Sequence, residues 1–296
     1  KFLNIVENDR AYSLGGYLPR NYINFDQSVA ACKKKGAGWH LNQTGVFAYL
    51  NLLSQKMGTV PHGNTNYGKD YYHPYERGTM PQGESQRTLT GSGQPTWYHN
   101  HDMSGIADIN GNLWEWTGGL RLMDGEIQII PYGNSMKLDC DMSAESTLWK
   151  AIKPDGTLVE PGTAGTLKLD QASASAGIRV NTKVEFPTSG GTYRNIAFKS
   201  LGAASGVTIP KLLIALGLYP DSGVTGYGND QIWMRCHGER LPFRGSAFYS
   251  TSNSGPSALN LNNPRSNSND NIGFRSALPL CQEALRLRPQ GQYKQG

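Results

Sequence analysis

The spacing of apolar residues predicts two amphipathic helices near the start of the chain. Residues 26–35 (DQSVAACKKK) place apolar side chains on one side of a helix that Asp26 would cap and Gly36 would end. In residues 44–58 (TGVFAYLNLLSQKMG), apolar residues again recur at helical spacing after a Thr cap and before a final Gly. A third, short helix is predicted at residues 209–217, between Pro and Gly.

Strand-like runs alternate with Gly and Ser turns through the middle of the chain, and a turn at 110–112 leads into a strand at 113–116 (LWEW). Residues 59–96 are rich in Gly, Pro, Asn and Tyr, and this segment is too long for an ordinary connection between two elements. We therefore expect a packed loop with a functional role.

Two apolar segments bracket a polar run near the end of the chain. Residues 241–245 (LPFRG) and 272–280 (IGFRSALPL) are typical of strands that enter a core. Between them, residues 244–275 hold seven Asn and seven Ser, a composition more usual in disordered segments. Because both ends are fixed, the run predicts a displayed surface with a defined backbone.

The composition indicates a globular chain whose surface is uncharged, polar and aromatic. Of its 296 residues, 38% are hydrophobic and 17% are charged, and there are 36 Gly and 15 Tyr. Antibody paratopes are enriched in the same residues, Tyr, Ser, Gly and Asn, so this composition suits a binding surface. The net charge of +5 is scattered, so we expect no nucleic-acid binding.

No stretch is long and apolar enough to span a membrane, and the first ten residues lack the apolar segment of a signal peptide. Cys32, Cys140, Cys236 and Cys281 stand far apart without a CxxC pair. This spacing favours buried thiols over zinc and leaves disulfides open.

Three segments, in order, resemble the C-type-lectin-like fold of formylglycine-generating and related sulfatase-modifying domains. They are GNLWEW (111–116), LPFRGSAF (241–248) and NIGFRSAL (271–278).

The resemblance covers residues 20–120 and 231–281, and it makes 121–230 an insert. It implies a single α+β domain over residues 1–296, with two helices on a small twisted antiparallel sheet and a large insert in the middle of the chain.

Within that fold, the run 244–275 is similar to the variable region of proteins diversified by retroelements. In that family, adenines of a template repeat are copied with errors, so Asn codons change while an exposed binding face is kept. The resemblance implies a ligand-binding protein of a phage tail or bacterial surface. Its partner would be a protein or glycan on a cell surface, and display on a homo-oligomer would raise avidity.

The resemblance also implies which positions are substituted and bind the ligand. They are Ser246, Ala247, Phe248, Tyr249, Ser250, Ser252, Asn253, Ser254, Pro256, Ser257, Asn269 and Asp270. Phe248 and Tyr249 would be exposed aromatic anchors, residues 258–268 a scaffold, and Arg244 and Arg275 structural. A Ser/Asn-rich loop without a binding role is the plain alternative.

The same template argues against an enzyme. Formylglycine-generating enzymes carry two cysteines in the stretch that corresponds to residues 247–271, and this chain has none there. A sulfatase-modifying-type enzyme or its inactive relative, and a structural virion protein, are the alternative functions.

The resemblance implies a calcium site as the one candidate cofactor site. Its ligands would be the carboxylates of Asp108 and Glu115 and the carbonyls of Gly111 and Leu113, all hard oxygen donors. The alternative is that Glu115 caps amides of the turn.

His99 and His101 stand two apart, so on a strand they would face the same side. Two ligands alone do not define a metal site, and a hydrogen-bonded structural pair is favoured. The spacing of His62 and His73 indicates no site.

Overall fold

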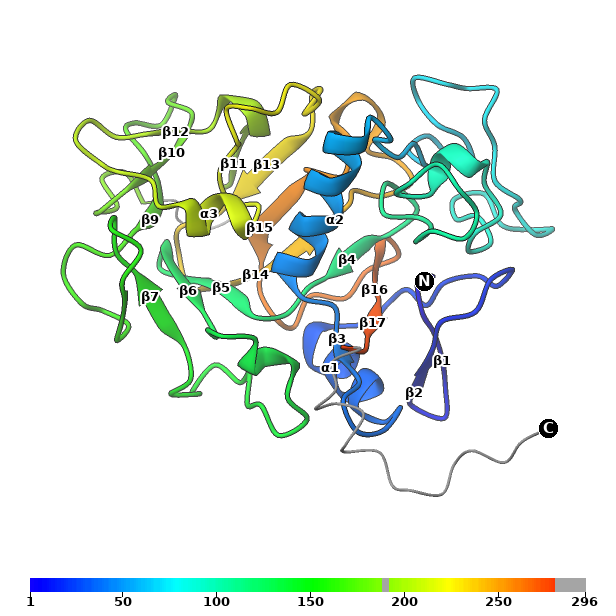
Figure 1. Cartoon of the computed structure of the whole chain (residues 1–296), viewed down its shortest axis with the longest axis horizontal. Coiled ribbons are helices and arrows are strands. Elements are labelled where there is room, and N and C mark those ends of the chain that lie inside the picture. The colour runs from blue at the N-terminus through cyan, green and yellow to red at the C-terminus, as the bar shows by residue number, and fades with distance from the viewer. Residues whose placement is uncertain (188–191, 280–296) are drawn as a thin grey trace.

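The computed structural model of the chain describes residues 1–187 and 192–279, which form an α+β fold around one large sheet (Figure 1). Its helices are α1 (Phe25–Lys33), α2 (Thr44–Met57) and α3 (Lys211–Ala215). Its strands are β1 (Ile5–Glu7), β2 (Arg10–Tyr12), β3 (His40–Leu41), β4 (Trp114–Trp116), β5 (Leu120–Met123), β6 (Glu126–Ile129), β7 (Lys150–Ile152), β8 (Leu158–Val159), β9 (Lys168–Gln171), β10 (Ile178–Asn181), β11 (Arg194–Ala197), β12 (Gly202–Ala203), β13 (Gln231–Met234), β14 (Glu239–Arg244), β15 (Leu259–Asn263), β16 (Ile272–Phe274) and β17 (Ser276–Ala277).

The three helices form where the apolar spacing predicts them. Helix α1 begins slightly earlier than expected because Asn24, rather than Asp26, is its cap. The Asn24 side chain accepts a hydrogen bond from Gln27 N (2.9 Å), and the Gln27 side chain accepts one from Asn24 N (3.0 Å). Gly58 ends α2 with φ 69°, a conformation that costs glycine little. No helix among the described residues has the length and apolarity to cross a membrane.

The main sheet has 13 strands within the described residues. Its strand order is β11-β13-β15-β14-β5-β6-β9-β10-β12; β4 pairs with β14 and β16, and β7 pairs with β6 and β8. The pairs β13/β15, β4/β16 and β10/β12 are parallel and the others are antiparallel. The expected small antiparallel sheet is therefore wrong. The residues expected as an insert supply most of β5 to β12: β5 continues the sheet from β14, whereas β11 pairs with β13 at the opposite end.

Helix α2 lies across the sheet near β14 and β15, with α3 beside it (Figure 1). One core packs β5, β6, β9 and β10 against β13, β15 and α3, and a second packs α1 against β4, β14 and β16. Cys32, Cys140 and Cys236 are buried, as expected, and Cys281 lies outside the described residues.

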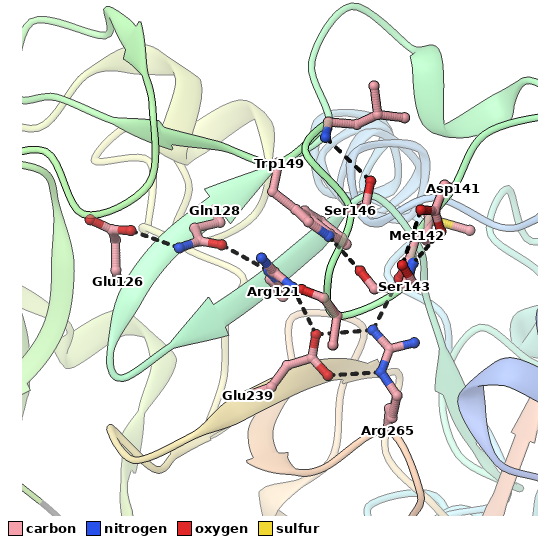
Figure 2. A network of polar contacts seen from close by, with 12 residues as sticks. Arg121, Glu126, Gln128, Asp141, Met142, Ser143, Ser146, Trp149, Glu239 and Arg265 are labelled. Atoms are coloured by element: carbon pink, nitrogen blue, oxygen red, sulfur yellow. Dashed lines mark hydrogen bonds and ion pairs between the residues drawn. The ribbon is translucent and has the colours of Figure 1, made fainter.

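Glu239, the first residue of β14, lies between two arginines (Figure 2). Its Oε1 accepts hydrogen bonds from Arg121 Nη1 (3.0 Å) and Arg265 Nη2 (2.9 Å), and its Oε2 accepts one from Arg265 Nε (2.8 Å). Arg121 Nε donates to Gln128 on β6 (2.8 Å), and Arg265 Nη1 donates to Asp26 on α1 (2.6 Å). This network joins the middle of the chain, the centre of the sheet and the Asn/Ser run.

Arg244, buried at the end of β14, connects α2 with the end of α3. Its Nη2 donates to Thr44 Oγ1 (2.9 Å) and to the Leu216 carbonyl (2.7 Å), and its Nη1 donates to the Gly217 carbonyl (2.9 Å). Burial lowers the pKa of Arg244 to about 9, so the guanidinium keeps its charge at neutral pH. The structural role of Arg244 is confirmed, although its carbonyl partners belong to the middle of the chain rather than to the Asn/Ser run.

We predict that Asn24→Ala lowers the free energy of unfolding by about 1 kcal/mol, because the first turn of α1 loses its side-chain acceptor. Urea denaturation followed by circular dichroism measures the change. Asn24→Asp keeps an acceptor and is expected to stay near the wild type; an equal loss in both variants would show that the cap is unimportant.

Candidate ligand-binding site

Residues 245–257, here named the display segment, join β14 to β15 and are fixed through their main chain. The main-chain bonds run from Gly111 N to Gly245 O (2.6 Å), from Phe248 N to Asn112 O (3.1 Å), from Tyr67 N to Phe248 O (2.8 Å) and from Thr251 N to Thr65 O (2.9 Å). The partners belong to the long loop 59–96 and to the turn 110–112. Because both sides of each bond are main-chain groups, a change of side chain leaves the bond available.

Many of the implied ligand-binding positions are buried. These are Ser246, Ala247, Phe248, Ser250, Ser254, Pro256 and Ser257. The expectation of exposure is wrong at these seven positions, because the segment packs against the turn 110–112 and its inward side chains find partners there and on α2. Ser246 Oγ donates to Asn110 Oδ1 (3.1 Å), and Ser257 Oγ accepts from Asn51 Nδ2 (2.9 Å).

Phe248 is a core residue and not an exposed anchor. Its side chain is 2% exposed and packs with Leu3 and Leu113. Its ring centroid lies 5.6 Å from that of Tyr67 and 5.3 Å from that of Tyr249.

The remaining implied positions reach the surface. Tyr249, Asn253 and Asn269 are exposed, and Ser252 and Asp270 are partly exposed. The expected exposure is confirmed for these five, while their contact with a ligand stays a prediction.

Nine residues line a hollow of about 320 Å³, here named the aromatic–amide hollow. They are Trp114, Tyr193, Trp233, Tyr249, Ser250, Thr251, Asn253, Asn260 and Asn262. Asn269 and Asp270 lie outside it. The structure thus brings three of the twelve implied positions together in this hollow, Tyr249, Ser250 and Asn253, while the other nine do not line it.

Tyr249 is held in place at the edge of this hollow. Its hydroxyl accepts a hydrogen bond from Asn271 Nδ2 (2.6 Å), while 43% of the residue remains exposed. Burial of the hydroxyl raises its pKa, so Tyr249 is neutral at physiological pH. A fixed ring with an open face is suited to contact a ligand.

Sequence reasoning missed the aromatic wall of the hollow. Trp114 lies in the strand expected at 113–116, and no binding role was expected for Trp114, Trp233 or Tyr193. Their convergence depends on the pairing of β4 with β14 and of β13 with β15 and β11. Only the alternation along β13, where Trp233 is less buried than Ile232 and Met234, could have signalled an outward-facing Trp.

A second hollow of about 260 Å³, here named the histidine hollow, lies on the other side of the display segment, against Ser254 and Pro256. His62 and His73 stack there with ring centroids 3.8 Å apart and an angle of 9°. His62 Nδ1 donates to Glu76 (3.0 Å), and His73 Nδ1 donates to Asp70 (3.1 Å). Their spacing in the sequence had indicated no site, because a long loop brings them together.

Asp230 also lines the histidine hollow, where it is almost fully buried. Its Oδ2 accepts a hydrogen bond from Ser257 N (2.7 Å), which anchors the end of the display segment. Burial raises the pKa of Asp230 to about 8, so this carboxyl holds its proton at neutral pH.

His99 and His101 form hydrogen bonds but do not lie on a strand. His99 Nδ1 accepts from Ile106 N (3.0 Å), and His101 Nε2 donates to the Val60 carbonyl (3.1 Å). Both follow the short turn 95–97 and lie in turns, so they do not share a strand face, and the favoured structural hydrogen bonds are confirmed.

The residues of the expected calcium site do not fit a cation site. Arg275 donates hydrogen bonds to both carboxylate oxygens of Glu115, from Nε to Oε2 (2.9 Å) and from Nη2 to Oε1 (2.8 Å). Its Nη2 also donates to the Asp108 carbonyl (3.1 Å). Asp108 Oδ2 accepts from Gly91 N (2.8 Å), and burial raises the pKa of Asp108 to about 6. A buried guanidinium already neutralises Glu115, which disfavours a second cation at the same carboxylate.

Glu115 therefore neither points to a free metal position nor caps the turn, and Arg275 is confirmed as structural. The described residues hold no group of three or more His, Cys, Asp or Glu side chains with the geometry of a metal site.

Comparison with protein-family models gives no match, and neither does comparison with curated proteins.

We predict that Phe248→Ala lowers the free energy of unfolding by about 3–5 kcal/mol, because it removes a buried ring and leaves a cavity. Tyr249→Ala, the neighbouring exposed aromatic, is the matched control and is expected to cost about 1 kcal/mol or less. Chemical denaturation of both variants tests this, and equal losses would contradict the assigned burial.

We predict that Asp230→Asn gains stability relative to the wild type as the pH rises. In the folded state Asp230 titrates near pH 8, far above the 3.8 of a free Asp, so between these values folding takes up a proton and wild-type stability falls with rising pH. Asn does not titrate, so the difference between the variants should grow by about 1.4 kcal/mol per pH unit across this window. Denaturation curves from pH 4 to pH 9 measure it; a constant difference would mean that Asp230 is ionised throughout.

Proposed function

We propose that this chain is a ligand-binding protein with a C-type-lectin-like fold, and that a retroelement diversifies the outward side chains of its display segment. One observation carries the proposal. The main chain of residues 245–257 is tied to main-chain groups of two other loops, whereas Tyr249, Ser252 and Asn253 reach solvent. Side chains at those three positions can change while the backbone keeps its shape.

The arrangement of the three sequence segments supports the C-type-lectin-like assignment. The WEW of residues 111–116 forms β4, which pairs with β14 from residues 241–248 and with β16 from residues 271–278. Segments that are far apart in the sequence thus make adjacent strands around the display segment, as a shared fold requires.

The setting that we propose follows from the same resemblance. The chain would act on a phage tail or a bacterial surface and bind a protein or glycan of another cell, with no nucleic-acid partner and no required cofactor. Assembly as a homo-oligomer would multiply the display segment and raise avidity for a weakly bound ligand.

Binding, rather than catalysis, is the function that the display segment supports. The copper-binding cysteines of the oxidase relatives would fall within residues 247–271, and this sequence has none there. A sulfatase-modifying enzyme or a structural virion protein would need no diversified segment, so the two alternatives and the proposal differ in a measurable way.

We predict that DNA next to the coding sequence holds a near-identical template repeat and a reverse-transcriptase gene, with differences between repeat and gene at adenines of the repeat. Sequencing the coding region in a population should place most substitutions at the codons of Tyr249, Ser252 and Asn253. The buried codons of Phe248 and Ser257 are the internal control, because most replacements there would destabilise the fold.

The absence of a template repeat would remove the retroelement from the proposal. Equal variation at buried and exposed codons would instead contradict the division of the display segment into fixed and changeable positions.

A further inference from the structure

We propose that the aromatic–amide hollow binds a neutral saccharide of mono- or disaccharide size. The inference rests on the proposed binding function and names the chemical class of the ligand. It depends on three properties of the hollow: free amide groups, exposed ring surface and a lining without charge.

The amides of the hollow have unused hydrogen-bonding capacity. Within the described chain, the side chains of Asn253 and Asn262 make no hydrogen bond, and Asn260 uses only its Oδ1, which accepts from Asn262 N (3.0 Å) and Asn263 Nδ2 (3.0 Å). Each amide can donate and accept at once. Adjacent hydroxyls of a sugar ring also donate and accept hydrogen bonds, so a pair of hydroxyls can bond to one of these amides.

Aromatic rings form the other wall. Trp114 and Trp233 pack edge to face, with centroids 5.5 Å apart and an angle of 89°. Trp233, Tyr193 and Tyr249 are partly exposed in the same hollow. The face of an aromatic ring is apolar and carries partial negative charge, so it packs well against the C–H face of a pyranose.

The lining excludes charged ligands. None of the nine described residues that line the aromatic–amide hollow is acidic, basic or a histidine. A bound ion would lose hydration there without a partner charge, which is costly. The histidine hollow differs, since Asp70, Lys199 and Asp230 line it.

The size of the hollow agrees with a small ligand. Its volume of about 320 Å³ lies at the lower end of the range for ligand pockets, about 300–1,000 Å³. A longer glycan would therefore place one terminal unit here and extend into solvent.

The lining residues differ in how freely they can change, whether they are amides or aromatics. Asn260 and Asn262 lie on β15 and Trp114 lies on β4, within paired strands, whereas Tyr249 and Asn253 belong to the display segment. The strand residues would recognise hydroxylated rings in general, and the display-segment residues would select among them. Diversification would then alter which saccharide binds while the class of ligand stays the same.

The test applies the purified chain to an array that carries neutral glycans, sialylated glycans, sulfated glycans and an unglycosylated protein. We expect retention on neutral glycans alone. Methyl pyranosides of mannose, galactose and N-acetylglucosamine, added in solution, should change the tryptophan fluorescence and compete for retention.

Asn262→Ala should weaken binding about 10-fold through the loss of one well-placed hydrogen bond, and Trp233→Ala should abolish it. Tyr132→Ala removes an aromatic ring that is 88% exposed outside this hollow and should leave binding unchanged. Because Trp233→Ala can perturb packing with Trp114, the surface variant Asn262→Ala decides the test if Trp233→Ala fails to fold.

No retention on any glycan, retention on charged glycans alone, or retention that survives Asn262→Ala would overturn the saccharide assignment. Such a result would leave the proposed function standing wherever population sequencing still places substitutions at the exposed codons. A failure of that sequencing result, with saccharide binding intact, would instead remove the retroelement and keep the site.

Discussion

Main-chain hydrogen bonds to two neighbouring loops set the shape of the display segment. Residues 65, 67, 111 and 112 supply the partners, and they exchange backbone N–H and C=O groups with residues 245–251. Buried arginines stabilise the two ends of the Asn/Ser run. Arg244 donates hydrogen bonds to α2 and to the end of α3, and Arg275 pairs with Glu115. A segment held in this way keeps its shape without help from its outward side chains.

This constraint divides the display segment into two kinds of position. Phe248 and Ser257 face inwards and belong to the fold, whereas Tyr249 and Asn253 face outwards and belong to the aromatic–amide hollow. The histidine hollow on the other side contains a buried carboxyl, Asp230, which anchors Ser257. A short polar segment therefore contributes at once to the core, to an uncharged hollow and to a hollow lined by titratable residues.

The helices, and the strands at 113–116, 241–245 and 272–280, could be predicted because their information is local. Gly58 ends α2 and β4 begins shortly after the turn 110–112, as apolar spacing and turn residues indicate. Burial along the display segment could not be predicted, since it has no regular period. Ser246 and Ala247 are small enough to be accommodated either in the core or on the surface. Even Phe248 was expected to be exposed, because it lies in the Asn/Ser run.

Local patterns were enough to predict the three helices, the strand at 113–116 and the apolar ends of the Asn/Ser run, because short-range periodicity, caps and turn residues specify them, whereas the α+β class and the structural arginines were implied by the family resemblance. Only the tertiary structure decided that the middle of the chain extends the main sheet, that Arg275 occupies Glu115, and that Trp114, Tyr193 and Trp233 converge beside Tyr249. These features depend on strand pairing between segments distant in the chain. Such pairing is set by the packing of the whole sheet, and no local pattern encodes it.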